Sequence, residues 1–217
     1  MAQTIGIRKA INNLNEAHKK LNLSQNSQTN FFTEWFDNLP ELEESEKNTL
    51  NRLKNRYLYY SADGAITEGT VNIIILSPLL ELIGLCDPPY KIRSEKLVTI
   101  EIENGAEEEE TILEGFIDAL AIQNQLWIIL IESKRYGFSV MQALPQTLAY
   151  MSANPNPEIP TFAMITNGED YIFVKLNQQK QYALSNKFTL ANPVKNELYD
   201  VMQIIKRIIS ASIIPLI

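Results

Sequence analysis

Three charged residues near the middle of the chain have the types and spacing needed for phosphodiester hydrolysis. Asp118 is followed by Glu132 and, two residues later, by Lys134, in the pattern Asp-x13-Glu-x-Lys. Two carboxylates and a backbone carbonyl form a hard oxygen site that favours Mg²⁺ or Mn²⁺. Such an ion polarises a phosphodiester and lowers the pKa of a bound water, while a neighbouring lysine stabilises developing negative charge. This chemistry requires no histidine.

Whether these side chains meet depends on two predicted strands, over 111–122 and 126–132. In a strand, residues two apart share a face, so Glu132 and Lys134 point the same way. A two-residue turn at 124–125 would pair Asp118 with Ile131 and put Glu132 on the opposite face. A three-residue loop at 123–125 would pair Asp118 with Leu130 and put Glu132 on its own face. Convergence therefore requires an odd loop or a β-bulge. In the alternative interpretation, the Glu-x-Lys is accidental and the three side chains do not converge.

The remaining hydrophobic patterns predict an α/β protein of the α+β type, with a mixed central sheet flanked by helices. We expect helices over 4–21, 31–39, 43–60, 67–84, 138–151 and 194–209. The helix over 67–84 is predicted as one kinked helix or two abutting ones, because Pro78 interrupts it and Gly84 ends it. Further strands are expected over 91–103, 161–166 and 171–176, with a candidate edge strand over 181–184.

The composition excludes several classes of site. The chain of 217 residues has one cysteine, Cys86, and one histidine, His18. It therefore has no intramolecular disulfide, four-cysteine zinc site or HExxH motif. There is no GxGxxG and no Walker A motif. The absence of a long apolar run and of a signal-like N-terminus predicts a cytoplasmic protein with no membrane partner.

The net charge of −7 is a local feature. Seven acidic residues and no basic ones lie between Glu101 and Glu114, and the rest of the chain has 19 acidic and 19 basic residues. We expect the run Glu107–Glu110 to be a solvated hairpin loop. The overall charge therefore provides no general attraction for phosphate, although it does not exclude a nucleic-acid partner.

Four local motifs around the charged trio resemble the PD-(D/E)xK nuclease superfamily, and more narrowly the N-terminal nuclease domain of type I restriction enzyme R subunits. They are Gly115-Phe116-Ile117-Asp118, Glu132-Ser133-Lys134, Gln146-Thr147-Leu148-Ala149-Tyr150 and Thr166-Asn167-Gly168. Upstream, Glu68 and the stretch Ser77-Pro78-Leu79-Leu80 with Gly84 resemble the first motif of that family. The likeness covers about residues 65–176. Ile117 stands where the superfamily pattern has proline.

The resemblance implies a role for each matching residue. Asp118 and Glu132 would bind Mg²⁺ or Mn²⁺ with the Ser133 carbonyl, and Lys134 would be the catalytic lysine. Glu68 would touch the metal or its waters. Gln146 and Tyr150 match a QxxxY motif that handles DNA, and Gln142 lies one turn earlier on the same helix face.

The resemblance also implies a division of the chain and a set of partners. Residues 1–62 would form a helical N-terminal extension packed on the core, and residues 63–217 a restriction-endonuclease-like domain. The expected function is a metal-dependent DNA endonuclease. The alternative is a catalytically silent nuclease-fold module that binds nucleic acid or a restriction-system partner. R subunits continue into a helicase motor that this sequence lacks, so a separate motor subunit or a homodimer is the expected protein partner.

Overall fold

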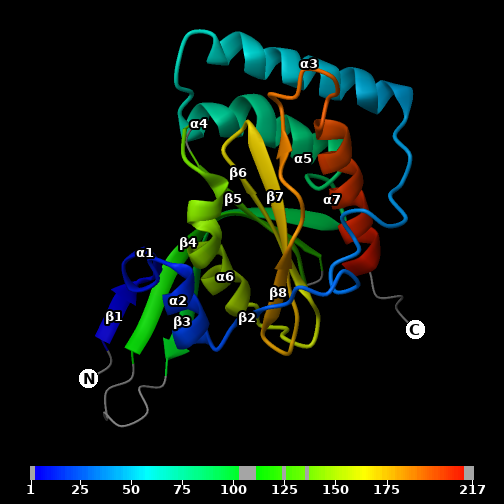
Figure 1. The fold of residues 1–217 in the computed structure, drawn as a ribbon. Coiled ribbons are helices and arrows are strands. Elements are labelled where there is room, and N and C mark those ends of the chain that lie inside the picture. The colour runs from blue at the N-terminus through cyan, green and yellow to red at the C-terminus, as the bar shows by residue number, and fades with distance from the viewer. Residues whose placement is uncertain (1–2, 103–110, 124–125, 135–136, 213–217) are drawn as a thin grey trace.

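The computed structural model describes residues 3–102, 111–123, 126–134 and 137–212, and within these ranges nine strands form one mixed sheet. The sheet order is β1-β4-β5-β6-β7-β8-β2, with β3 paired to β4 and β9 paired to β7. The strands are β1 (Gln3–Gly6), β2 (Ser24–Gln25), β3 (Tyr90–Ile102), β4 (Thr111–Gln123), β5 (Leu126–Ser133), β6 (Thr161–Thr166), β7 (Asp170–Leu176), β8 (Gln181–Leu184) and β9 (Phe188–Thr189). The predicted mixed sheet with flanking helices is confirmed at this level (Figure 1).

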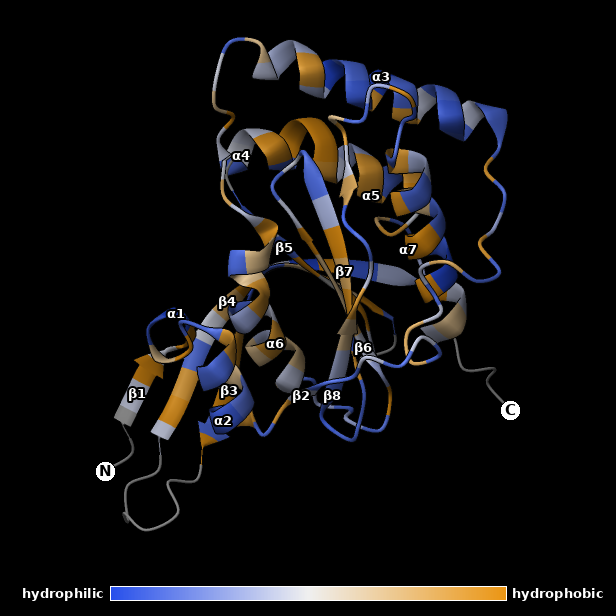
Figure 2. Cartoon of the chain, viewed as in Figure 1, coloured by the Kyte–Doolittle hydropathy of each residue, from blue (hydrophilic) through white to orange (hydrophobic). Residues whose placement is uncertain are grey.

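Helices cover the sheet in two groups, each with its own hydrophobic cluster. One cluster joins the sheet to α3 (Glu44–Ser61), α5 (Ser77–Ile83) and α7 (Leu198–Ser212). The other joins it to α1 (Ile7–Ala10), α2 (Leu14–Leu21) and α6 (Leu144–Ser152). Figure 2 shows α3 as mostly hydrophilic and the helical run from α4 to α5 as mostly hydrophobic, because α3 is the outer helix of its group. None of the described helices is long and apolar enough to cross a membrane.

The helical run over 67–84 is continuous and contains a π-helical turn. It consists of α4 (Glu68–Val71), the π turn η1 (Asn72–Leu76) and α5, and it ends at Gly84 with φ +85°. Pro78 lies in the first turn of α5. Proline lacks an N–H and clashes with the carbonyl four residues earlier, and a π turn relieves both constraints. The predicted interruption by Pro78 is thus accommodated without breaking the run. The predicted helix over 43–60 is confirmed as α3.

The N-terminal predictions need correction. The expected helix over 4–21 is instead β1, α1 and α2. Gln3–Gly6 pairs in parallel with β4, so these residues belong to the sheet. Asn13 then caps α2, its side chain accepting a hydrogen bond from the Glu16 N–H at 3.0 Å. The N-terminal segment is therefore not purely helical, since it adds both β1 and β2 to the sheet.

The expected helix over 31–39 is also wrong, because this stretch consists of turns. Phe32 is buried against Phe162, with ring centroids 6.1 Å apart. Asn38 adopts a left-handed backbone with φ +53°, which interrupts a right-handed helix. The aromatic spacing therefore reflects packing against the sheet.

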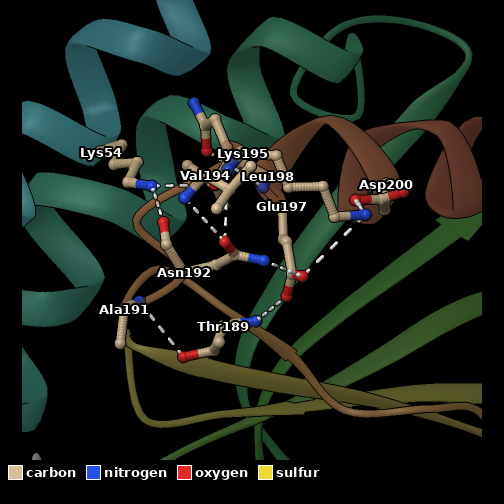
Figure 3. Close-up of polar contacts among 10 residues, drawn as sticks. Lys54, Thr189, Ala191, Asn192, Val194, Lys195, Glu197, Leu198 and Asp200 are labelled. Atoms are coloured by element: carbon tan, nitrogen blue, oxygen red, sulfur yellow. Dashed lines mark hydrogen bonds and ion pairs between the residues drawn. The ribbon is translucent and has the colours of Figure 1, made fainter.

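The connection into α7 is fixed by polar contacts rather than by the predicted extra helical turns. Glu197 accepts hydrogen bonds from the Thr189 N–H at 2.6 Å and the Asn192 side-chain amide at 2.7 Å (Figure 3). Lys54 of α3 donates to the carbonyls of Asn192 and Lys195. Because these groups hold residues 189–197 in an irregular path, α7 begins at Leu198.

The predicted helix over 138–151 also begins later than expected. It consists of a 3-10 turn, η2 (Val140–Ala143), followed by α6.

The hairpin of β4 and β5 contains the bulge that the sequence requires. Ile122 pairs with Trp127, but Ala121 pairs with Ile129, so Ile128 is the extra residue. Beyond the bulge, Ala119 pairs with Ile131. Continuing this register places Asp118 opposite Glu132, on the same face of the sheet. The prediction of an odd loop or bulge is confirmed, with the bulge at Ala121/Ile122.

A second irregularity in the β3–β4 ribbon falls at Asp118 itself. Residues an even number of positions apart in a regular strand share a face. Leu113 and Ile117 pack in the cluster of α6, but Ala119 and Ala121 pack in the cluster on the other face. The change of face lies opposite Glu95, whose φ is +49°. A non-glycine residue with positive φ is uncommon in a strand. Here it marks the point, at Asp118, where the buried side chains of β4 change from one face of the sheet to the other. The expected acidic loop 107–110 lies outside the described residues.

Candidate active site

The candidate site lies where one edge of β4 changes its partner. β3 pairs with β4 along the whole strand, so β1 and β5 share the opposite edge. β1 pairs with residues 111–114 and β5 with residues 119–123. The four residues between, Gly115 to Asp118, face the ends of both neighbours. This gap brings the end of β5, with Glu132 and Lys134, next to the start of α1.

The structure brings Asp118, Glu132, Ser133 and Lys134 together. The Ser133 backbone N–H donates to Asp118 Oδ2 at 2.7 Å, and the Ser133 hydroxyl lies 3.3 Å from the same oxygen. Lys134 donates to Glu132 Oε1, and its Nζ lies 4.0 Å from Asp118 Oδ2. The ammonium group of Lys134 therefore lies between both carboxylates. This convergence contradicts the alternative of an accidental Glu-x-Lys.

Glu132 has an unusual environment for a carboxylate. It is fully buried, and its Oε2 atom has no hydrogen-bond partner among the described residues. Burial, together with the negative charge of Asp118, raises the pKa of Glu132 to about 7 against the opposing effect of Lys134 and Arg8. A buried, unpartnered carboxylate oxygen is costly unless it binds something. The surroundings of Glu132 suit a hard cation, which would balance the negative charge of this carboxylate and coordinate the lone pairs of Oε2.

Arg8 belongs to the site although the sequence analysis did not select it. Its Nη2 lies 3.8 Å from Glu132 Oε1, and its side chain is 66% exposed. Arg8 lies in a segment whose amphipathic spacing indicated only a helix, and no signal in the sequence connects it with residues more than a hundred positions away. The parallel pairing of β1 with β4 brings it there.

Gln146 and Tyr150 lie beside the trio, on α6. Both side chains are buried, and the Gln146 side-chain amide donates to the Tyr150 hydroxyl. Burial raises the pKa of Tyr150, and the nearby charge of Glu132 adds to the rise. A Cβ on Gly115 would lie 2.8 Å from Tyr150 Cε1, so only glycine lets the ring approach β4 this closely.

The remaining predicted site residues lie apart from this group. Gln142 is exposed on η2 and is not among the residues that line the site. Glu68 begins α4 and is half-buried. Within the described ranges, no three or more histidine, cysteine, aspartate or glutamate side chains gather to hold an ion, so Glu68 does not join Asp118 and Glu132 in such a group. The catalytic role of Glu68 and the DNA-handling role of Gln142 stay predictions.

A cleft of about 600 Å³ opens over the site. Its walls come from the β1–α1 junction on one side and from β3, β4 and α6 on the other. Asp118, Arg8 and Tyr150 line it, together with the acidic residues Glu95 and Glu114. The cleft therefore has room for an extended substrate beside a carboxylate pair, with a cation and a tyrosine on its walls.

Comparison with known proteins gives little further evidence. No protein-family model and no curated protein matches the chain. Among solved structures, it is similar to a fragment of a putative HsdR subunit of a type I restriction enzyme from Vibrio vulnificus YJ016, with 19% sequence identity and a TM-score of 0.41. The alignment covers 63% of this chain and 26% of the other. Agreement at this level assigns neither a family nor a function.

Proposed function

We propose that this protein is a metal-dependent nuclease of the restriction-endonuclease type, which hydrolyses phosphodiester bonds in DNA. The observation that carries the proposal is the convergence of Asp118, Glu132 and Lys134 beneath one cleft. Two separate irregularities, the bulge at Ala121/Ile122 and the turn of the ribbon at Glu95, produce this convergence. Irregular strand geometry next to a candidate site supports a functional role.

The donor atoms of the site fit Mg²⁺ or Mn²⁺. Asp118, Glu132 and the backbone carbonyl of Ser133 would hold the ion, and the unpartnered Glu132 Oε2 is the strongest reason to expect one. When bound, the ion would polarise the phosphodiester and lower the pKa of a coordinated water.

The chain's own residues would hold and orient the reacting groups. The Ser133 N–H fixes the Asp118 carboxylate at 2.7 Å, so Asp118 keeps its orientation when substrate enters. Lys134, with its side chain only 10% exposed, holds a positive charge in a dry position where it can stabilise charge on a phosphate oxygen. Tyr150, fixed by Gln146, forms a wall of the cleft against which a nucleotide can be positioned.

Cleavage assays with a matched lysine variant test the proposal. Supercoiled plasmid and single-stranded DNA are incubated with Mg²⁺ or Mn²⁺ and with wild type, Lys134→Ala or Lys47→Ala. Lys47 is a partly exposed lysine of α3, paired with Glu44 and outside the site. We expect metal-dependent cutting by wild type and Lys47→Ala, and a loss of roughly a hundredfold or more in Lys134→Ala. Equal cutting by all three proteins would contradict the role of Lys134 and indicate a contaminating nuclease.

Absence of cutting in every protein would favour the catalytically silent module. Such a module would still bind nucleic acid or a restriction-system partner, which a gel-shift assay with the same DNA would detect. The close pairing of Lys134 with Glu132 makes this the second candidate, because a lysine held by a carboxylate is less free to reach a substrate. A homodimer or a separate motor subunit remains the predicted protein partner for double-strand cutting.

A further inference from the structure

Arg8 lies at the wall of the cleft with most of its side chain exposed. Its nearest described carboxylate oxygen, Glu132 Oε1, is 3.8 Å away, which is beyond hydrogen-bonding distance, and Lys134 already donates to that oxygen. The guanidinium group also interacts with the hydroxyl of Tyr150, another residue that lines the cleft, and its five N–H groups outnumber these two partners. An arginine presents up to five N–H groups in a planar fork, a geometry that matches phosphate oxygens.

The local fold fixes this position. Gly6 pairs with Glu114 in the parallel register of β1 and β4, and α1 follows at once. Ile7 and Ala10 of α1 are buried in the cluster of α6, so Arg8 is turned outward over the site. Ile7 also lies against the position of Gly115, where an added Cβ would be 3.2 Å from Ile7 Cδ1. The backbone of Arg8 is thus held by both strand pairing and packing.

The charges of the residues that line the cleft favour a role for Arg8 in binding an anion. Glu95, Glu114 and Asp118 line the cleft, and Arg8 is the basic residue among its described lining residues. A polyanion entering this cleft meets three carboxylates at its walls, with Glu132 buried behind them. A cation at the rim offsets that repulsion and selects the orientation of an incoming phosphate.

We propose that Arg8 is a substrate-binding residue that contacts a non-bridging oxygen of the nucleic-acid phosphate held at the Asp118–Glu132 site. The inference rests on the proposed function for its substrate class, a phosphodiester backbone. It assigns to the N-terminal β1–α1 unit a direct part in the site: without this unit the cleft loses both one wall and its basic residue.

Binding and cleavage by arginine variants test the role of Arg8. The full chain is compared as wild type, Arg8→Ala, Arg8→Lys and Arg52→Ala, the last removing an exposed arginine of α3. Affinity for a labelled 20-base-pair duplex is measured from low to moderate salt with Ca²⁺, and the duplex is checked for integrity afterwards. Thermal unfolding confirms that each variant is folded. Cleavage rates with Mg²⁺ are measured in parallel.

We expect Arg8→Ala to reduce the slope of log affinity against log salt by about 1, the signature of one lost phosphate contact. Arg8→Lys should keep most of the slope but cut roughly tenfold more slowly, because an ammonium lacks the planar fork. Arg52→Ala should match wild type. A slope and affinity unchanged in Arg8→Ala would overturn the proposal.

The outcomes separate this inference from the proposed nuclease activity. If wild type binds but does not cut, and Arg8→Ala still loses one phosphate contact, the nuclease proposal fails and the role of Arg8 stands. If wild type cuts and Arg8→Ala cuts and binds equally well, the nuclease stands and the role of Arg8 fails. If wild type neither binds nor cuts nucleic acid, both are overturned.

Discussion

At the scale of single residues, Glu132 is the feature that most needs a functional explanation. A carboxylate with no exposed surface and an unpartnered oxygen destabilises a fold that has no use for it. Lys134 and Arg8 lower the free-energy cost of burying this negative charge but do not remove it, since the pKa of Glu132 is still raised to about 7. This free-energy cost is explained if the ionised carboxylate of Glu132 binds a ligand.

The raised pKa of Glu132 predicts a pH-dependent stability in the absence of metal. Between about pH 4.5 and pH 7 the folded protein keeps a proton that the unfolded chain releases, so the folded state loses stability as the pH rises through this window. The full penalty, at most about 3 kcal/mol from a shift of that size, is present above pH 7. Glu132→Gln carries no such penalty. Measured by denaturant unfolding in EDTA, the stability of Glu132→Gln relative to wild type should increase between pH 5 and pH 8.

The control for this prediction is Glu44→Gln, which removes an exposed carboxylate of α3. Its stability relative to wild type should stay constant over the same range. A constant difference for Glu132→Gln would mean that Glu132 is ionised throughout. In addition, Ca²⁺ should stabilise wild type more at pH 8 than at pH 6, because protons compete for the same oxygens.

At the scale of elements, the site depends on how closely α6 approaches β4. Tyr150 of α6 lies over Gly115 of β4, where there is no room for a side chain. The buried face of α6 supplies the rest of this contact, through the cluster that includes Leu144 and Leu148. The glycine that precedes the Phe116-Ile117-Asp118 motif therefore has a packing explanation: it sets the distance between the tyrosine and the carboxylates.

Gly115→Ala should destabilise the protein by about 1–3 kcal/mol, because the new Cβ would overlap the Tyr150 ring. It should also displace Tyr150 and widen the cleft, reducing cleavage beyond what the loss of stability explains. Gly69→Ala is the matched control, since a Cβ there would meet nothing within 4 Å in helix α4. That change should be neutral or stabilising by up to about 1 kcal/mol. Equal stability of the two variants in thermal unfolding would contradict the packing argument.

At the scale of the whole molecule, the chain is acidic and its cleft is acidic as well. The formal net charge is −7, and three carboxylates line the cleft. Electrostatics therefore provides no general attraction for a polyanion and opposes its entry into the cleft. Under the proposed function, a nucleic-acid substrate would gain its affinity locally, from divalent ions at the site together with Arg8 and Lys134.

Binding of DNA should therefore require a divalent ion. The affinity of the full chain for a short duplex should fall at least roughly tenfold when Ca²⁺ is replaced by EDTA at the same ionic strength, because two carboxylates then face the phosphate unneutralised. Fluorescence anisotropy measures the change. Undiminished affinity in EDTA would show that DNA binds to a surface other than this cleft.

The sequence by itself determined the charged residues of the candidate site and most of the regular elements. The types and spacing of Asp118, Glu132 and Lys134 predict a hard-cation and phosphate chemistry. The apolar run of β5 and the alternation in β3 indicate strands through local periodicity. The need for a bulge also follows from the sequence alone, because side chains alternate strictly along a strand.

Only the tertiary structure decided what surrounds those residues. Residues 3–6 become a strand because β4 has a free edge there, and no local pattern in four residues can reveal a partner at 111–114. The same pairing brings Arg8 to Glu132, and the left-handed backbone of Glu95 lies opposite Asp118, where the buried side chains of β4 change face. Long-range pairing and burial fix these positions, and they depend on residues far away in the chain. That is the physical reason why the three charged residues could be selected from the sequence, whereas the cleft and the arginine at its wall could not.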